Sequence, residues 1–384
     1  MNKRIAGFII SAVFAAALPL SAYAEISPAF TRTDEEWTLL RDNKLEWSEI
    51  PDLIKEYNAD VIDNENSFKK DETTAMNASE VKSYLIRQAN NYEDTATDLE
   101  DVTGMASTAA SMRALANSTR LSAEENVTDS SVIRMGYDQK RDAITLEAQN
   151  YFINYYNLKL QREYLEKNYA YLERSYASAV AKQSVGMATE TDVLNAKKTL
   201  DTAEAGLTTA KASESAAYKN LIVLCGWKYD SNAEIGELPA FDFSTIDAID
   251  YEADKAKALE NSYTLRSDRI KLSNVDSADD VEYVTSKYQR QLASDTSNVE
   301  NTIKQDYDAL ITARNSWVTA NTAFVLANDN LLTGARQLQL GTISAMDYAG
   351  IEESYRAAEK SLKAAEYSVY SAMITYQSAV NGLT

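Results

Sequence analysis

The stretches VGMATETD at residues 185–192 and LGTISAMD at residues 340–347 decide the fold of this chain. They align at an offset of 155 residues, which matches glycine with glycine, a Thr with a Ser, and an Asp with an Asp. Glycine ends a helix readily because it adopts the left-handed conformation without a Cβ penalty. A Ser or Thr three residues later can begin the next helix, and an Asp three further on can complete a capping box. Each stretch therefore predicts the tip of a helical hairpin.

The sequence after each tip carries apolar or small residues in alternating steps of three and four. This is the a/d spacing of a left-handed coiled coil, and in the first series it is interrupted only at Glu214. Both series end alike, with Leu-Cys-Gly at 224–226 and Val-Asn-Gly at 380–382. Matched stops, caps, seams and ends indicate an internal duplication.

Composition narrows the class of function. The 384 residues include only four prolines and eleven glycines, which favours long helices. The absence of histidine removes the usual general base and the commonest metal ligand, and the single Cys225 excludes an intramolecular disulfide. A formal charge of −20 disfavours nucleic acid as a partner. Without a phosphate loop or a nucleophile elbow, we expect no enzyme, no catalytic or metal-binding residues and no cofactor.

The chain divides into a leader and two repeats. Residues 1–24 read as a secretory signal peptide, because a basic start and an apolar run precede Ala22-Tyr23-Ala24. A first repeat, 25–235, would contain an N-terminal cap and the tip near 186. A second repeat, 236–384, would contain the tip near 341. The chain is therefore expected to be exported to the cell envelope.

Helices are expected between these landmarks. A long polar helix is predicted from about 73 to 117, followed by a polar stretch without helix signals at 118–131. An uninterrupted helix should run from about 132 to 185. In the second repeat we expect one helix at 251–273, a polar break at 274–280, and a long helix from 281 to the second tip.

This layout resembles the TolC family of outer-membrane efflux proteins, which form trimeric exit ducts. The two tips carry the resemblance, together with residues 261–266, which look like the family's Asn-Pro-Glu-Leu-Arg stretch with Ser262 in place of proline. The resemblance implies long antiparallel coiled-coil hairpins in two internal structural repeats, and the helical pattern of this chain makes the expected fold all-α. Three such protomers would build a TolC-like α-barrel.

The resemblance also implies partners and sites. A homotrimer would dock to a periplasmic adaptor (membrane fusion) protein that works with an inner-membrane transporter. Asp192 and Asp347 would lie nearest the tunnel mouth, although either could merely cap a helix. Ile343 and Gly350 stand where the family often has Arg and Asp, so a salt-bridged gate is not expected. The implied adaptor-docking positions are Val185, Gly186, Met187, Leu340, Gly341 and Thr342.

One departure from the family leaves two functions open. The family inserts two strands into each half, and these barrel strands enter the outer membrane. The places where they belong, 118–131 and 274–280, are too short for two spanning strands and do not alternate. We therefore expect strands that are missing or vestigial. The chain could be the tunnel of an efflux or secretion system, or a non-conducting coiled-coil scaffold of the envelope.

Overall fold

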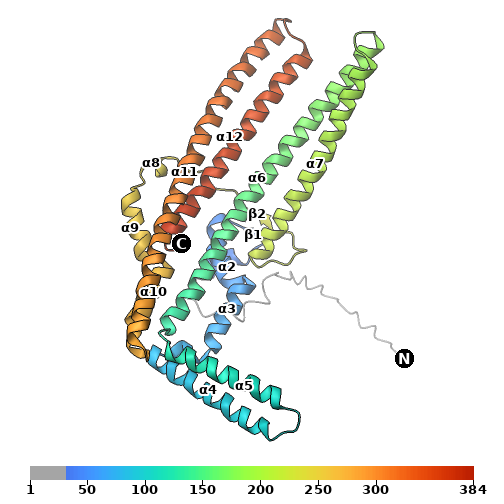
Figure 1. Ribbon diagram of the computed structural model, residues 1–384. Coiled ribbons are helices and arrows are strands. Elements are labelled where there is room, and N and C mark those ends of the chain that lie inside the picture. Colours follow the sequence, from blue (N-terminus) through green and yellow to red (C-terminus); the bar gives the residue numbers. More distant parts are fainter. Residues whose placement is uncertain (1–31) are drawn as a thin grey trace, which may run out of the picture.

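The computed structural model describes residues 32–384, which form twelve α-helices and two short strands (Figure 1). The leader expected at 1–24 lies outside the described residues. The helices are α1 (Asp34–Leu40), α2 (Ile50–Tyr57), α3 (Ala59–Lys70), α4 (Ala78–Glu100), α5 (Ala106–Glu124), α6 (Ser130–Ser184), α7 (Glu190–Leu224), α8 (Ser244–Asp247), α9 (Tyr251–Asn261), α10 (Tyr263–Ser273), α11 (Val281–Gln339) and α12 (Ala345–Val380).

Two long hairpins dominate the fold and point their tips in the same direction (Figure 1). Helices α6 and α7 form the first, α11 and α12 form the second, and α12 packs against α6 between them. The order across the molecule is therefore α11, α12, α6, α7. Helices α6 and α11 have 55 and 59 residues, so each is roughly 80–90 Å long at 1.5 Å per residue. The predicted all-α fold of two hairpin repeats is confirmed.

The interruption of the first seam has a structural partner. Glu214 on α7 accepts hydrogen bonds from Arg162 on α6, at 2.7 Å from Nε and 3.3 Å from Nη2. Arg162 also contacts Glu166 one turn along its own helix, at 2.9 Å. A charge pair therefore replaces an apolar contact at this level of the α6–α7 seam.

Two hydrophobic clusters lie away from the tips, where short helices pack on the hairpins. In the first, α2 packs on α6 and α7 around the fully buried Ile54, Phe152 and Leu221. In the second, α9 and α10 pack on α11 and α12 around Leu265 and Ile303. The large, fully buried side chains gather in these clusters, while the seams nearer the tips contain many alanines and half-exposed residues.

Strands are nearly absent from the described residues. β1 (Lys44–Leu45) and β2 (Glu234–Ile235) form one parallel pair of two residues each. Neither junction expected to lack strands contains one: the first holds α5 and a loop, and the second holds the 3-10 turn η3 (Val275–Ser277). The expectation of missing or vestigial strands is confirmed for these junctions. Among the described residues, no helix is both long and apolar enough to cross a membrane.

The expected helix at 73–117 is wrong, and so is the expected lack of helix at 118–131. The chain instead folds back at residues 101–105, where Gly104 has φ +87°, to form the hairpin α4–α5. Alanine recurs every seventh residue on both helices and is almost fully buried between them, which lets the axes approach closely. The buried alanines are Ala89, Ala96, Ala109, Ala116 and Ala123.

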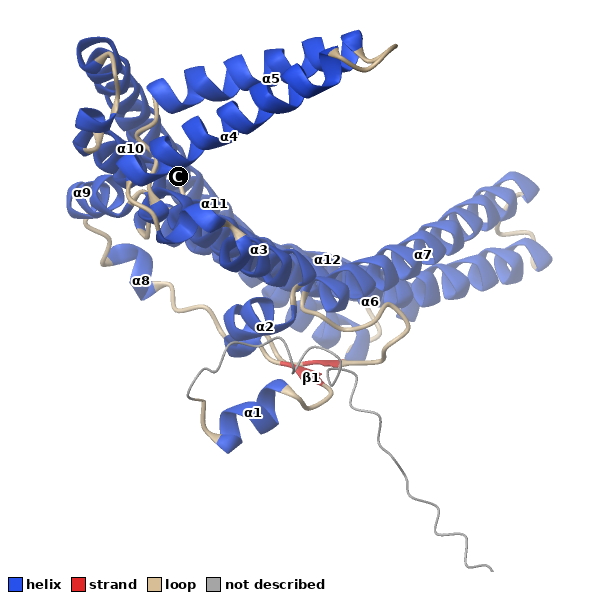
Figure 2. Cartoon of the chain, turned by 90° about the horizontal axis from the view of Figure 1, so that it is seen from below, coloured by secondary structure: helices blue, strands red, loops and turns tan. Residues whose placement is uncertain are grey.

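The single helix expected at 251–273 is divided at Ser262, which has non-helical backbone angles, φ −47° and ψ 121°. Its hydroxyl accepts from the Leu265 amide and caps α10, while the Tyr263 amide donates to the carbonyl of Gly382 at 3.1 Å. The helix breaks because these backbone groups bond to the end of the second hairpin. Figure 2 shows the long helices as a curved wall, with α1, α2 and β1 on one side and α4–α5 on the other.

Candidate functional site

Both predicted tips form tight turns at the expected glycines. Gly186 has φ +77° and Gly341 has φ +69°, the left-handed conformation that favours glycine. In each turn the amide after the glycine bonds back to the last helical turn, from Met187 to the Lys182 carbonyl at 2.8 Å and from Thr342 to the Gln337 carbonyl at 2.9 Å. These bonds satisfy carbonyls that a helix end leaves open.

Capping boxes begin the descending helices α7 and α12. The carboxylate of Asp192 accepts from the amide and hydroxyl of Thr189, at 2.8 and 2.7 Å, and Asp347 does the same with Ser344, at 3.0 and 2.7 Å. These hydrogen bonds lower the pKa of both carboxyls below the ordinary range. The predicted capping role of both Asp residues is therefore present, and both carboxylates remain at the exposed end of the molecule.

The tips expose large apolar side chains beside bare glycine. Val185, Met187 and Leu340 are 68%, 76% and 78% exposed, and a Cβ added at either tip glycine would meet nothing within 4 Å. Thr342 differs, since its hydroxyl donates to the Gln337 carbonyl at 3.0 Å. Each turn thus places a glycine with open space around it beside exposed side chains.

The two hairpins also interact through polar groups near the tips. Lys182 of α6 lies close enough to Asp347 of α12 to contribute to the lowered pKa of that carboxyl. Further down, the Asn168 amide donates to Glu353 at 2.7 Å, and Arg356 binds Glu353 at 3.1 Å. The sequence analysis did not identify Lys182, because nothing local shows that α6 and α12 are neighbours.

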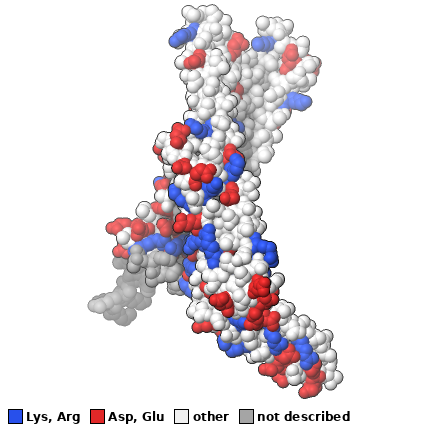
Figure 3. All heavy atoms as spheres, turned by 60° about the vertical axis from the view of Figure 1, so that its left-hand side comes forward, with Lys and Arg blue, Asp and Glu red and all other residues white. Residues whose placement is uncertain are grey.

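The outer face of α11 carries an apolar stripe that the sequence analysis also missed. Val318, Val325 and Leu332 recur at seven-residue intervals and are 48%, 52% and 53% exposed. Between residues 315 and 335 the only charged residue is Asp329. Figure 3 shows a band with few charged side chains between the tips and the middle of the molecule. The signal was present as a second heptad series, on the face of α11 that points away from α12.

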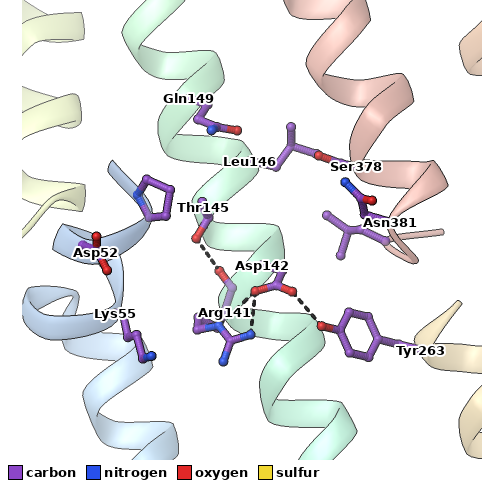
Figure 4. A pocket seen from close by; sticks show the side chains of 12 residues that line it. Asp52, Lys55, Arg141, Asp142, Thr145, Leu146, Gln149, Tyr263, Ser378 and Asn381 are labelled. Atoms are coloured by element: carbon purple, nitrogen blue, oxygen red, sulfur yellow. Dashed lines mark hydrogen bonds and ion pairs between the residues drawn. The ribbon is translucent and has the colours of Figure 1, made fainter. Parts of the chain in front are cut away.

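A pocket of about 430 Å³ lies at the joint between the two halves, away from the tips (Figure 4). Asp142 of α6 accepts from the Tyr263 hydroxyl at 2.7 Å and binds Arg141 at 2.9 Å. These charged groups are thus engaged with one another. Within residues 32–384, no group of three or more His, Cys, Asp or Glu side chains could hold a metal.

Comparison with solved structures shows a shared fold. The OprN outer-membrane channel aligns with a TM-score of 0.56 at 12% identity, over 90% of this chain and 92% of that one. The CmeC outer-membrane channel of Campylobacter jejuni gives 0.55 at 12% over 100% and 94%, and CusC gives 0.55 at 9% over 88% and 92%. The sequence matches no protein-family model and no curated protein. The TolC-like fold is confirmed, and the proteins that share it are channels rather than enzymes.

Proposed function

We propose that three copies of this chain associate into a helical tunnel, the outer component of an efflux or secretion system. The fold shared with outer-membrane channels supports the architecture. The observation that carries the proposal is the stripe on α11, defined by Val318, Val325 and Leu332. A charge-poor heptad on a half-exposed helix face needs a further helix to cover it.

A neighbouring copy provides that helix. Because α11 and α7 are the outer long helices of the curved wall, the α11 edge of one copy would meet the α7 edge of the next (Figures 1 and 2). Leu194 on α7 is 61% exposed and offers an apolar contact of its own. A contact between two different edges closes into a ring when the rotation between copies fits, and three copies would contribute twelve long helices.

The tips are the proposed docking end. The exposed Val185, Met187 and Leu340 beside Gly186 and Gly341 would receive the hairpin ends of a periplasmic adaptor, with Thr342 at the rim. Asp192 and Asp347 would lie nearest the tunnel mouth, where their lowered pKa keeps them charged. The adaptor would connect the tunnel to an inner-membrane transporter.

This function places the chain in the cell envelope. Residues 1–24 would direct its export and be removed, leaving a first repeat at 25–235 and a second at 236–384. A non-conducting scaffold of the envelope is the second candidate. The α4–α5 hairpin favours it, since a helical arm stands where the family has its strands.

Light scattering after gel filtration tests the assembly. The form beginning at Glu25 should elute as a trimer, and a Val318→Glu/Val325→Glu/Leu332→Glu variant should be monomeric with unchanged helix content. Leu121→Glu on α5, which is 64% exposed and outside the stripe, is the control and should remain trimeric. A trimer that tolerates all three stripe substitutions would remove the basis of the proposal.

Transport distinguishes the two candidates once the trimer is established. A tunnel should restore solute export when expressed with its adaptor and transporter, and cysteines placed at residues 187 and 342 should cross-link to the adaptor. A trimer that neither cross-links nor restores export would favour the scaffold.

A further inference from the structure

An aspartate occupies a core position in the joint between α10 and α11. Leu265, Asp268 and Leu272 share one face of α10, at the i, i+3, i+7 spacing of a buried stripe. Leu265 is fully buried in the second hydrophobic cluster, and Leu272 packs on a smaller cluster around Val275 and Val284. Asp268 lies between these two apolar regions and is only 3% exposed.

A second aspartate faces it from α11. Asp295 lies on the face of α11 that also carries Leu292 and Val299, which pack in the second cluster. Its carboxylate is within hydrogen-bonding reach of the carboxyl of Asp268. It also accepts from the side-chain amides of Gln291 at 2.7 Å and Asn298 at 3.3 Å.

The surroundings of Asp268 offer a negative charge little compensation. Lys271 contributes positive charge, with its Nζ at 3.6 Å from Oδ1. The other oxygen, Oδ2, is buried and has no hydrogen-bond partner among the described residues. From α11, the groups facing Asp268 are Asp295 and the half-buried phenol of Tyr288. Two adjacent carboxyls in such a site ionise together only at a high free-energy cost.

We propose that Asp268 binds a proton in the folded chain and that this proton clamps α10 onto α11. With the proton in place, the Asp268 hydroxyl donates to the side chain of Asp295, and the buried oxygen gains the partner that it lacks. When the proton leaves, a buried negative charge faces Asp295 between the apolar clusters, and the joint loosens.

The sign of the pH dependence follows from the environment of Asp268. Burial raises its pKa, Asp295 raises it further, and Lys271 opposes both. A carboxyl with a raised folded-state pKa contributes stability that is fully present below the unfolded pKa and is lost as the pH rises through the folded value. The clamp is therefore closed in acid and weakens as the pH rises through the raised pKa of Asp268.

The joint supports the α4–α5 hairpin. The segment after α10 binds the end of α5 through the amide of Asp279, which donates to the Glu124 carbonyl at 3.0 Å. Asp279 also forms an ion pair with Lys82 at the start of α4, and Lys287 of α11 pairs with Glu125. Loosening α10 would therefore release part of the base on which this hairpin stands.

Asp268→Asn tests the clamp, because an amide imitates the protonated carboxyl in shape and can donate to Asp295. The full chain, the variant and the control Asp276→Asn would be melted at pH 5.0 and pH 7.5 and followed by circular dichroism. Asp276 is exposed and close by, so the control makes the same charge change outside the joint. Hydrogen exchange of peptides covering residues 263–273, corrected for intrinsic rates, reports on the joint locally.

We expect Asp268→Asn to raise the melting midpoint at pH 7.5 and to protect 263–273 more strongly than in the parent chain, with a smaller difference between the two proteins at pH 5.0. Each unit of raised pKa corresponds to about a tenfold change in the opening equilibrium. Equal midpoints and equal exchange at pH 7.5 would overturn the proposal. So would a rise in the parent's midpoint at pH 7.5 on adding Ca²⁺ or Mg²⁺ that is absent in Asp268→Asn, because the pair would then hold a metal cation and not a proton.

Discussion

Replacing Gly186 or Gly226 by alanine distinguishes two reasons for a glycine in this fold, a left-handed backbone and close packing against a neighbouring helix. Both have positive φ, +77° and +100°, so alanine at either position pays for a left-handed backbone, about 1–2 kcal/mol. At the Gly186 tip the added Cβ would meet nothing within 4 Å, and the backbone term should be the whole effect.

Gly226 follows the end of α7 and lies against α2. A Cβ there would lie 2.9 Å from the Tyr57 carbonyl oxygen and closer still to the Tyr57 Cβ, in a helix whose Tyr57 is almost fully buried. Backbone cannot move aside as a flexible side chain can, and overpacking costs about 1–3 kcal/mol in addition. We therefore expect Gly226→Ala to lose roughly 2–5 kcal/mol.

Guanidinium unfolding followed by circular dichroism measures both variants. The unfolding midpoint should fall modestly for Gly186→Ala and by a clearly larger amount for Gly226→Ala, with unchanged slopes. The second repeat provides a replicate: Gly341 is open, while a Cβ at Gly382 would lie 2.8 Å from the carbonyl carbon of Asn261. Equal losses at tip and base, in both repeats, would refute the packing argument.

Three further perturbations have defined outcomes. Arg162→Leu leaves the largely buried Glu214 without its partner, so the free energy of unfolding measured in urea should fall by about 1–3 kcal/mol. The double variant Arg162→Leu/Glu214→Leu should recover most of this loss, and a loss that is not recovered would contradict the pairing. Asp192→Asn removes a carboxylate whose pKa is lowered by hydrogen bonds from Thr189, so its stabilisation is present above the unfolded pKa and disappears as the pH falls through the folded one. Melting curves of parent and variant should therefore differ at pH 7 and converge in strong acid, and a constant difference would exclude this origin. Burial raises the pKa of Cys225 to about 12, so at pH 8 a disulfide reagent should label the folded chain far more slowly than the chain in urea; rapid labelling of the folded chain would show that the base of α7 is open.

The hairpins and their tips were predictable because each signal is local. A glycine with positive φ, a hydroxyl that accepts from an amide three residues on, and a heptad seam act within a few residues of one another. The tip glycines and the capping Asp192 and Asp347 therefore lie where the sequence placed them. The near absence of strands at both junctions followed in the same way from segment length and the lack of alternation.

The α4–α5 hairpin and the break at Ser262 were not predictable from local signals. Residues 73–124 contain no proline and a single glycine, and the contact between two alanine series shows that the chain reverses at this Gly104. Ser262 ends α9 because its neighbours bond to residues near the C-terminus, about 120 positions away. Helix propensity depends on residues close in sequence, so it gives no information about a partner that far along the chain.

The sequence by itself thus determined the two hairpins, their turns and their helical period, because backbone sterics and capping hydrogen bonds operate within one or two turns. Only the tertiary structure decided which helix faces which. It placed Lys182 near Asp347, left the α11 stripe uncovered, and set Asp268 against Asp295. These juxtapositions depend on how long helices pack side by side, where the burial of distant apolar groups fixes the position of every polar group carried with them.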